Sequence, residues 1–476
     1  MVKYQIIKVN SGPLPAYQQS ICEKGRISMA NKRLDLTVGN PMKQILLFSL
    51  PLVVGALFQQ LYSFVDTIMV GRLISNNALA AVGSVSSLNF LVIGFVGGSC
   101  SGFAIPLAKS IGAKDTAAFQ KYLWNGCWIC IFLAGIMTVL TNLLTYPLLN
   151  LIHTPGDILE DAARYIRILF CGIPVTILYN FTAGILRASG DSQRPTNHLL
   201  FSSCVNIVLD YICIVPLAMG VSGAALATVS SQLLSGLLNL RWIVFKTDLL
   251  AGSRDHCRLS KYHLGQLCRI GFPMGFDTCI VGLGSVAMQS AINTLGTAAV
   301  TGQVAGEKIR QIFTLPMSSV GAGMATFAGQ NDGAKRYDRL KEGIRGAITL
   351  QLCYSLLACL IINLGKHGFA SLILGPNSGQ PGVYAAQYLT VMSLLFWVNG
   401  TMFALRNMLT GMGYSAYSVF SGICELIGKS IGGLLAVKWF GFWGICIATP
   451  LAWFLAMVYC GILVRHFLKQ RLTGKL

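Results

Sequence analysis

Five of the chain's 17 acidic residues lie inside long apolar stretches: Asp66, Asp210, Asp277, Glu307 and Glu425. A charge at the centre of a bilayer costs about 2.5 to 3.5 kcal/mol even on the most lenient scale, so an acid at that depth needs a partner or a function. These five residues are therefore the first candidates for chemistry.

The acids differ in whether a basic residue follows them closely. Glu307 precedes Arg310 by three residues and Glu425 precedes Lys429 by four, spacings that allow ion pairs along a helix. Asp277 has no such neighbour. Glu307 and Glu425 are interpreted as members of structural ion pairs. For Asp277 and Glu307 we also keep the hypothesis that they line a central substrate cavity, while Asp277 could equally lie near the cytoplasmic surface.

Polar side chains recur at helical spacing around the first two acids, so that each set shares one helix face. The four sets are Gln59, Ser63 and Asp66; Asn180; Ser202, Asn206 and Asp210; and Thr228, Ser231, Gln232 and Ser235. Facing one another, they would enclose two carboxylates, amide carbonyls and hydroxyls. Such hard oxygen ligands suit a small cation, and two carboxylates in a partly dry pocket suit a proton carrier. The alternative is that Asp66 and Asp210 only hydrogen-bond neighbouring helices.

Twelve apolar stretches can position these side chains as membrane-crossing helices, because each holds the ~20 residues that span the hydrocarbon core. They are 44–70, 79–107, 121–147, 162–186, 196–217, 221–245, 267–294, 298–328, 344–364, 383–408, 415–437 and 441–465. The chain is 54% hydrophobic and 11% charged, whereas a soluble domain carries about 25% charged residues. This composition excludes an ordinary cytosolic enzyme and, despite a net charge of +19, a nucleic-acid-binding protein.

The basic residues predict the orientation of the spans. Most of the 36 Lys and Arg fall before the first span, in loops after even-numbered spans, or in the C-terminal tail, and Arg406 is counted among them. Since cytoplasmic loops carry the excess of Lys and Arg, both termini are predicted to be cytoplasmic. The polar segment before the first span is predicted to be largely disordered, with Met29 as a candidate natural start.

A repeat at about 221 residues divides the chain into two six-helix units. Residues that match within two positions of this offset are Pro51 with Pro273, Gly102 with Gly323, Gly112 with Gly333, Arg187 with Arg406, Gly220 with Gly441 and Gly223 with Gly444. Because six is even, both units enter the membrane in the same orientation. The predicted parts are a cytoplasmic tail 1–43, an N lobe 44–245, a cytoplasmic linker 246–266, a C lobe 267–465 and a cytoplasmic tail 466–476.

The repeat does not reproduce the N-lobe acids. At an offset of 221, Asp66 falls on Ala287 and Asp210 on Ile431. Residues needed only for the shared architecture would be expected twice, so the lobes are predicted to be functionally unequal. Transporters built from such repeats bind substrate between the halves and rock them.

Prolines and glycines within the spans predict bends and close contacts. Pro51 and Pro273 occupy the same place in the first helix of each lobe, which makes them hinge candidates. Gly94, Gly98 and Gly102 form two overlapping GxxxG steps, which allow close approach of another helix.

Several motifs, in order along the chain, resemble multidrug and toxic compound extrusion (MATE) transporters. They are PLVVGALFQQLYSFVDTIMVG, ALAAVGS, SGFAIPLAKSIGAKD, LRASGD, NIVLD, GVSGAALATV, GFPMG and ATFAGQNDGAK. The resemblance covers residues 35–465 and is strongest to the bacterial branch with damage-inducible-F-like and Staphylococcus-type exporters.

The resemblance implies an antiporter of the bacterial cytoplasmic membrane that exports amphipathic, often cationic compounds in exchange for Na⁺ or H⁺. Carried over residue by residue, it assigns cation coupling to Asp66, Asn180, Asn206, Asp210 and Thr228, with a candidate Na⁺ site at Asp66, Asn206 and Asp210. It also assigns a bend of the first helix to Pro51. Another branch has acids in the middle of helix seven and in helix ten, whereas in this chain the helix-seven acid, Asp277, is displaced toward Pro273 and helix ten has none.

The sequence also bears on other functions and on the expected binding partners. A lipid-linked precursor flippase on a related scaffold is the main alternative, although such proteins carry a basic central cavity. A major-facilitator carrier would have a D-R-x-G-R-R type loop where this chain has KSIGAKD. No HExxH motif, nucleophile pair or metal triad lies in the spans, so we expect no enzyme and no cofactor beyond the coupling ion. Expected partners are small-molecule substrates and membrane lipid, without nucleic acid, for a monomer whose cavity includes Gln59, Ser63, Asp277 and Glu307.

Overall fold

The computed structural model describes residues 34–250, 257–376 and 378–473, and over these ranges the chain is a helical bundle without strands. Its first half contains α2 (Pro41–Met69), the π-helical turn η1 (Val70–Ile74), α3 (Asn76–Ser84), α4 (Ser86–Gly112), α5 (Thr116–Leu143), α6 (Thr145–Leu151), α7 (Gly156–Cys171), α8 (Ile173–Ala188), α9 (Gln193–Ile214) and α10 (Val221–Lys246). Its second half contains α11 (Lys261–Asn293), α12 (Thr297–Gly333), α13 (Tyr337–Leu374), α14 (Gly379–Leu394), α15 (Phe396–Gly411), α16 (Ser415–Phe440) and α17 (Phe442–Leu472).

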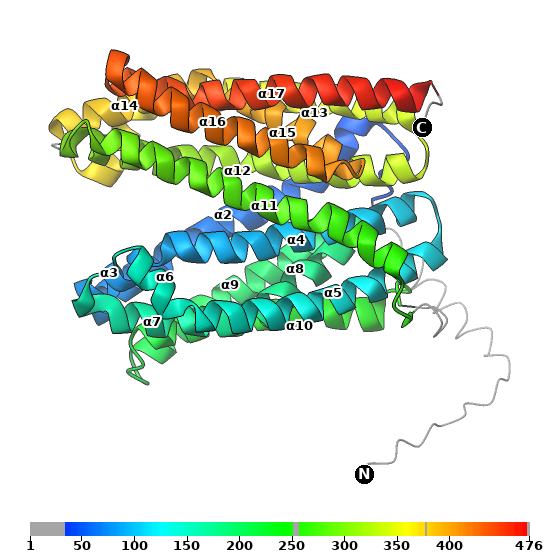
Figure 1. The fold of residues 1–476 in the computed structure, drawn as a ribbon, viewed down its shortest axis with the longest axis horizontal. Coiled ribbons are helices and arrows are strands. Elements are labelled where there is room, and N and C mark those ends of the chain that lie inside the picture. Colours follow the sequence, from blue (N-terminus) through cyan, green and yellow to red (C-terminus); the bar gives the residue numbers. More distant parts are fainter. Residues whose placement is uncertain (1–33, 251–256, 377, 474–476) are drawn as a thin grey trace, which may run out of the picture.

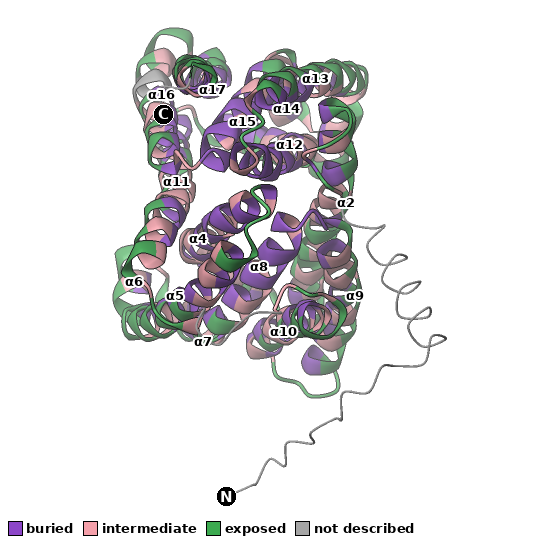
Figure 2. Ribbon diagram, turned by 90° about the vertical axis from the view of Figure 1, so that its right-hand side faces the viewer, coloured by how far each residue is buried: buried purple, intermediate pink, exposed green. Residues whose placement is uncertain are grey.

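The two halves form two lobes, as the repeat predicts. In Figure 1 the helices from α3 to α10 form the lower half of the bundle and those from α12 to α17 the upper half. We call the end at which α2 begins and α17 ends the terminal end. Figure 2 shows buried residues gathered on α4, α8, α12 and α15 in the middle, with exposed residues around the outside. Large apolar side chains such as Leu364 and Leu372 are 81% and 83% exposed on that outer surface, as expected for a surface that faces lipid.

The first helix of each lobe crosses to the other lobe (Figure 1). Near its start α2 packs against α13 at Gly346, and further along it packs against α9, where Gly55 meets Thr196. In the same way α11 packs against both α4 of the N lobe and α16 of the C lobe. A side chain at Gly98 or Gly102 would collide with the backbone of α11, so the predicted close contact at the GxxxG steps is confirmed.

Twelve membrane-crossing helices are compatible with these elements. Among the described residues, eight helices are long and apolar enough to cross a membrane, and two bent pairs raise this number to ten. The long helices α11 and α12 fall short of the same criterion. In α12, Glu307, Lys308 and Arg310 lie within one turn, which lowers the local hydropathy of a helix that is 37 residues long.

The fourth helix of each lobe is broken, which the sequence-based spans 162–186 and 383–408 did not predict. The breaks lie between α7 and α8, with a bend of 44°, and between α14 and α15, with a bend of 50°. Pro174 lies in the first turn of α8. The backbone N–H groups of a first turn have no hydrogen-bond partner within the helix, so a proline is tolerated there. By contrast, α2 continues as a helix through Pro51 and α11 through Pro273.

Both predicted tails are partly ordered. Met29 and residues 1–33 lie outside the described residues, but Leu36 is fully buried between the lobes rather than part of a disordered tail. At the other end, α17 continues to Leu472 because Phe467 stacks on Tyr414 with ring centroids 4.0 Å apart. The helix α11 begins at Lys261, within the predicted linker 246–266.

Candidate functional site

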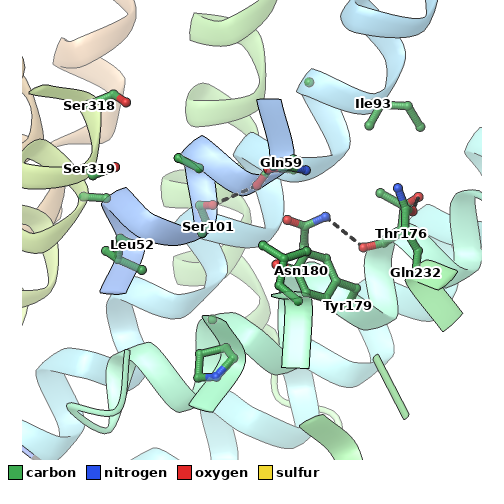
Figure 3. Close-up of a pocket in the computed structure, with 18 of the residues that line it drawn as sticks. Leu52, Gln59, Ile93, Ser101, Thr176, Tyr179, Asn180, Gln232, Ser318 and Ser319 are labelled. Atoms are coloured by element: carbon green, nitrogen blue, oxygen red, sulfur yellow. Dashed lines mark hydrogen bonds between the residues drawn. The ribbon is translucent and has the colours of Figure 1, made fainter. Parts of the chain in front are cut away.

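A cavity of about 800 Å³ lies between the lobes and is lined mainly by the N lobe. Of the residues predicted for a site, Gln59, Ser63, Asp66 and Asn180 line it. The C lobe contributes a short stretch of small polar side chains on α12, including Ser318 and Ser319, which face the cavity opposite α2 (Figure 3). The cavity is therefore an inter-lobe site of the size that binds small molecules.

Hydrogen bonds fix one wall of this cavity. The Thr176 hydroxyl donates to Gln232 Oε1 over 2.8 Å, which connects α8 to α10. The amide of Asn180 donates to the Thr176 carbonyl over 2.9 Å (Figure 3). Asn180 Oδ1 is thereby oriented by its own helix and remains an acceptor available to a ligand or a water molecule.

A second, much smaller cavity of about 20 Å³ lies in the N lobe, where Asn206 on α9 and Ser235 on α10 line it. Both amide atoms of Asn206, both carboxylate oxygens of Asp210 and the Ser235 hydroxyl are buried and have no hydrogen-bond partner in the structure. Asn206 and Asp210 are 1% and 0% exposed and lie one turn apart on α9. Leaving a buried polar group unpaired costs about 1 to 3 kcal/mol, so this cluster is the place where a cation or a proton would be stabilising.

Asp66 belongs to the same electrostatic unit. Its Oδ1 is buried without a partner and it lines the large cavity, while it interacts electrostatically with Asp210 behind the cavity wall. Tyr62 and Tyr165 each lie within electrostatic range of both carboxylates. The two predicted N-lobe acids thus lie within electrostatic range of each other and of two tyrosines that the sequence analysis did not select.

Thr228, on α10, is the last of the residues predicted for cation coupling. It lines neither cavity, and its carbonyl accepts a hydrogen bond from Ser231 over 2.9 Å. Across the described residues, no group of three or more His, Cys, Asp and Glu side chains could hold a metal ion. A Na⁺ ion at Asp66, Asn206 and Asp210 would therefore rely on amide and hydroxyl oxygens as well as carboxylates.

The C-lobe acid Glu307 is held by several partners and does not line the large cavity. Arg310 contacts both of its carboxylate oxygens, at 2.7 and 2.5 Å. The Tyr388 hydroxyl donates to the same carboxylate over 2.7 Å. The ion pair expected from the sequence is present, and the expectation that Glu307 lines the cavity is not met, because its oxygens point at these partners instead.

A second group of charges in the C lobe is organised by Arg406. Its guanidinium binds the carboxylate of Glu425 and lies 3.7 Å from Asp277, while Lys429 approaches Glu425 to 3.8 Å. Asp277 does not line the cavity, contrary to one of the two expectations for it. Arg406, which the sequence analysis counted with the cytoplasmic basic residues, lies within α15 and is only 7% exposed inside the C lobe.

The large cavity is closed at the terminal end by contacts between the ends of α4 and α12. Lys109 Nζ forms an ion pair with Asp332 over 2.7 Å and donates to the Met412 carbonyl over the same distance. A side chain at Gly112 would collide with the backbone of Gln330, and one at Gly333 with the backbone of Lys109. These repeated glycines therefore allow each helix end to pass close to the other lobe.

Residues 34–40 form a strap across the same closure. Leu34 N–H donates to the Gly190 carbonyl of the N lobe over 3.1 Å. From the C lobe, Arg339 donates to the carbonyls of Leu36, Val38 and Gly39 over 2.7 to 3.1 Å. The strap thus connects both lobes immediately before α2 begins.

Comparisons with known proteins agree with this architecture. The family model described as MatE matches residues 51–212 and 273–431, once in each lobe. The probable multidrug resistance protein YpnP of Bacillus subtilis is 31% identical to this chain over 63% of the chain and 67% of its own length. The multidrug export protein MepA of Staphylococcus haemolyticus is 23% identical, with 90% of this chain and 94% of its own length covered.

Solved structures share the fold. An outward-facing conformation of a multidrug resistance MATE family transporter has a TM-score of 0.87 at 23% identity, with 93% of this chain and 99% of that chain covered. A crystal structure of MATE in the bent conformation has a TM-score of 0.86, also at 23% identity, with 92% and 98% covered. The predicted all-helical fold with two six-helix lobes is confirmed.

Proposed function

Because the chain belongs to the MatE family of transporters, we propose that it is a cation-coupled antiporter that exports amphipathic, often cationic compounds across the bacterial cytoplasmic membrane. The observation that carries the coupling is the pair of N-lobe acids. Asp66 and Asp210 interact with each other, and their buried oxygens lack hydrogen-bond partners. The names of the relatives, which are multidrug exporters, support the substrate class.

The proposed state is outward-facing. The excess of basic residues assigns the terminal end to the cytoplasm, and that is the end closed by Lys109, Asp332 and the strap. Substrate leaving the cavity toward the outside would allow Na⁺ or H⁺ to enter and neutralise the N-lobe carboxylates. Neutral carboxylates favour the inward-facing arrangement, in which the lobes rock and the ion is released to the cytoplasm.

Reciprocity then couples the two fluxes. If ion binding weakens the hold on substrate, substrate binding must weaken the hold on the ion by the same factor. Each inward positive charge gains about 2.3 kcal/mol per 100 mV of membrane potential, and each positive charge exported with the substrate costs the same amount. Exchange of one ion for one monocationic substrate is therefore driven by the concentration gradient of the ion. The cycle needs only the ion, the substrate and the two lobes, without a further cofactor.

A lipid-linked precursor flippase is the second candidate, and the composition of the cavity argues against it. A pyrophosphate needs several basic groups, whereas the described residues that line the cavity include one base, Arg187, and one acid, Asp66. The relatives named above are a probable multidrug resistance protein and a multidrug export protein, which supports drugs as the substrate.

The proposal is tested with purified protein in proteoliposomes, in which transport of the dye rhodamine 6G is measured. The wild-type protein should export the dye when a Na⁺ gradient or a pH gradient is imposed, and one of the two gradients should be sufficient alone. Asp66→Asn should abolish the gradient-driven part, while the exposed-site control Asp248→Asn should retain it. Full gradient-driven export by Asp66→Asn, or none by the wild type under either gradient, would contradict the proposal.

A further inference from the structure

One basic side chain in the large cavity has no counter-ion. Arg187 is the penultimate residue of α8, near the terminal end, and lines the cavity. It interacts electrostatically with Tyr179 and Cys100, and within the described part of the chain no carboxylate or hydrogen-bond acceptor engages its guanidinium. A guanidinium presents five donors in a planar fork that matches a carboxylate or a phosphate, so this one is a binding group without its ligand.

The repeat shows what such an arginine looks like when it is structural. Its C-lobe counterpart Arg406 binds the carboxylate of Glu425, donates to Ser421 over 2.6 Å and lies near Asp277. Glu425 follows Arg406 by 19 residues, and 19 residues after Arg187 the N lobe has a neutral amide, Asn206. The C-lobe arginine is therefore neutralised inside its lobe, whereas the N-lobe arginine faces the cavity with its charge uncompensated.

The acid and the base of the cavity wall lie toward opposite ends of the cavity. Gly55 on α2 packs against Thr196, three residues into α9 and close to the terminal end that Arg187 occupies. Asp66 lies 11 residues further along α2, about 16 Å at the rise of an α-helix. A bound molecule can thus present a cationic group toward Asp66 and an anionic group toward Arg187.

We propose that Arg187 binds a carboxylate, sulfonate or phosphate group of the transported compound, so that this transporter accepts zwitterionic amphipaths as well as simple cations. The inference rests on the proposed function and specifies its substrate class. Among the described residues that line the cavity, Arg187 is the only base. Replacing it with a neutral residue therefore removes the positive charge that would attract an anionic group. Binding of compounds without an anionic group should depend little on this residue.

The test uses two dyes that differ at one functional group. Rhodamine 6G is a cationic ethyl ester, and rhodamine 19 is the corresponding free acid, a zwitterion at neutral pH. Equilibrium binding of each dye is measured by fluorescence polarisation on the full chain in nanodiscs, without an ion gradient. The variants are Arg187→Gln, Arg187→Lys and the control Arg241→Gln, whose side chain is exposed on α10.

The wild-type protein should bind both dyes. Arg187→Gln should bind rhodamine 19 about 10-fold more weakly, the effect expected for one lost charge-assisted contact, while its affinity for rhodamine 6G changes less than about 2-fold. Arg187→Lys should recover part of the affinity for the acid, and Arg241→Gln should match the wild type for both dyes.

Three results would overturn the inference. They are a wild-type protein that binds the ester but not the acid, an Arg187→Gln protein that binds the acid normally, and a folded Arg187→Gln protein that loses both dyes equally. If Arg187→Gln does not fold, the affinities of the wild-type protein for rhodamine 19 and rhodamine 6G still test the inference. Since the readout is binding at equilibrium, a failure of ion-driven export of rhodamine 6G would contradict the proposed antiport without altering this result.

Discussion

The two lobes share one scaffold but treat their buried charges in opposite ways. In the N lobe, Oδ1 of the half-buried Asp66 and both carboxylate oxygens of the buried Asp210 have no hydrogen-bond partner. In the C lobe, Glu307 and Glu425 are each bound by an arginine. A buried acid with a fixed arginine partner is part of the structure, because removing either partner leaves an uncompensated charge. A buried acid without one can exchange an ion or a proton, which is the property that coupling requires.

The largest expected effect tests the N-lobe half of this contrast. Asp210→Asn should reduce ion-driven export of rhodamine 6G by about 10-fold or more, because it removes one of the two carboxylates whose charge the ion neutralises. The same substitution should not lower the free energy of unfolding, since no described partner loses a hydrogen bond. Transport in proteoliposomes, with Asp248→Asn as control, gives the first value, and titration with SDS in mixed micelles gives the second.

A comparison of the two repeated arginines tests the C-lobe half. Arg406→Gln should lower the free energy of unfolding by about 3 to 5 kcal/mol, because Glu425 and Asp277 would lose the base that they share. Arg187→Gln removes a charge that has no ion-pair partner and should be much less destabilising. Equal losses for the two variants in the same micelle titration would contradict the contrast.

A smaller effect is expected where the lobes meet. Asp332→Asn removes the carboxylate that pairs with Lys109 and Arg471 and should weaken the closure by about 1.5 to 3 kcal/mol. Hydrogen exchange at the strap, residues 34–40, should then become about 10- to 150-fold faster. Asp338→Asn, an exposed neighbour on α13, provides the control and should leave the exchange rate unchanged.

The smallest effect sharpens the account of Glu307. Tyr388→Phe removes one of several hydrogen bonds to this carboxylate and leaves Arg310 in place. The free energy of unfolding should fall by about 1.5 kcal/mol, clearly less than for Arg406→Gln, with ion-driven export retained. The exposed-site variant Tyr211→Phe measures the effect of losing a hydroxyl alone.

The features that the sequence could predict are those set by the spacing of residues within one helix. Apolar runs of membrane length located the helices, and the glycine spacing at Gly98 and Gly102 located the contact between α4 and α11. The polar stripes also placed Asn206 and Asp210 together, because residues on one face of one helix stay together when the helix packs. Their grouping with Asp66, which is on another helix, rested on the expectation that the stripes face one another.

Contacts between distant helices were not accessible in the same way. Counting charges by loop placed Arg406 at the cytoplasmic surface, because its partners Glu425 and Asp277 are on other helices. Tyr62 and Tyr165 were missed for the same reason, since an aromatic residue in an apolar run is usually part of the core. The breaks after α7 and α14 depend on how each half-helix packs, and only Pro174 marks one of them in the sequence.

The most direct test of the central claim is a dye-driven counterflow of ions. Proteoliposomes hold the wild-type protein, Asp66→Asn/Asp210→Asn or Glu307→Gln, and an imposed gradient of rhodamine 6G is the only driving force while movement of Na⁺ and H⁺ is recorded. Wild type and folded Glu307→Gln should move one of these ions opposite to the dye, and the N-lobe double variant should move dye without ions. Undiminished ion counterflow in the double variant, or its loss only in Glu307→Gln, would contradict the assignment of coupling to the N lobe.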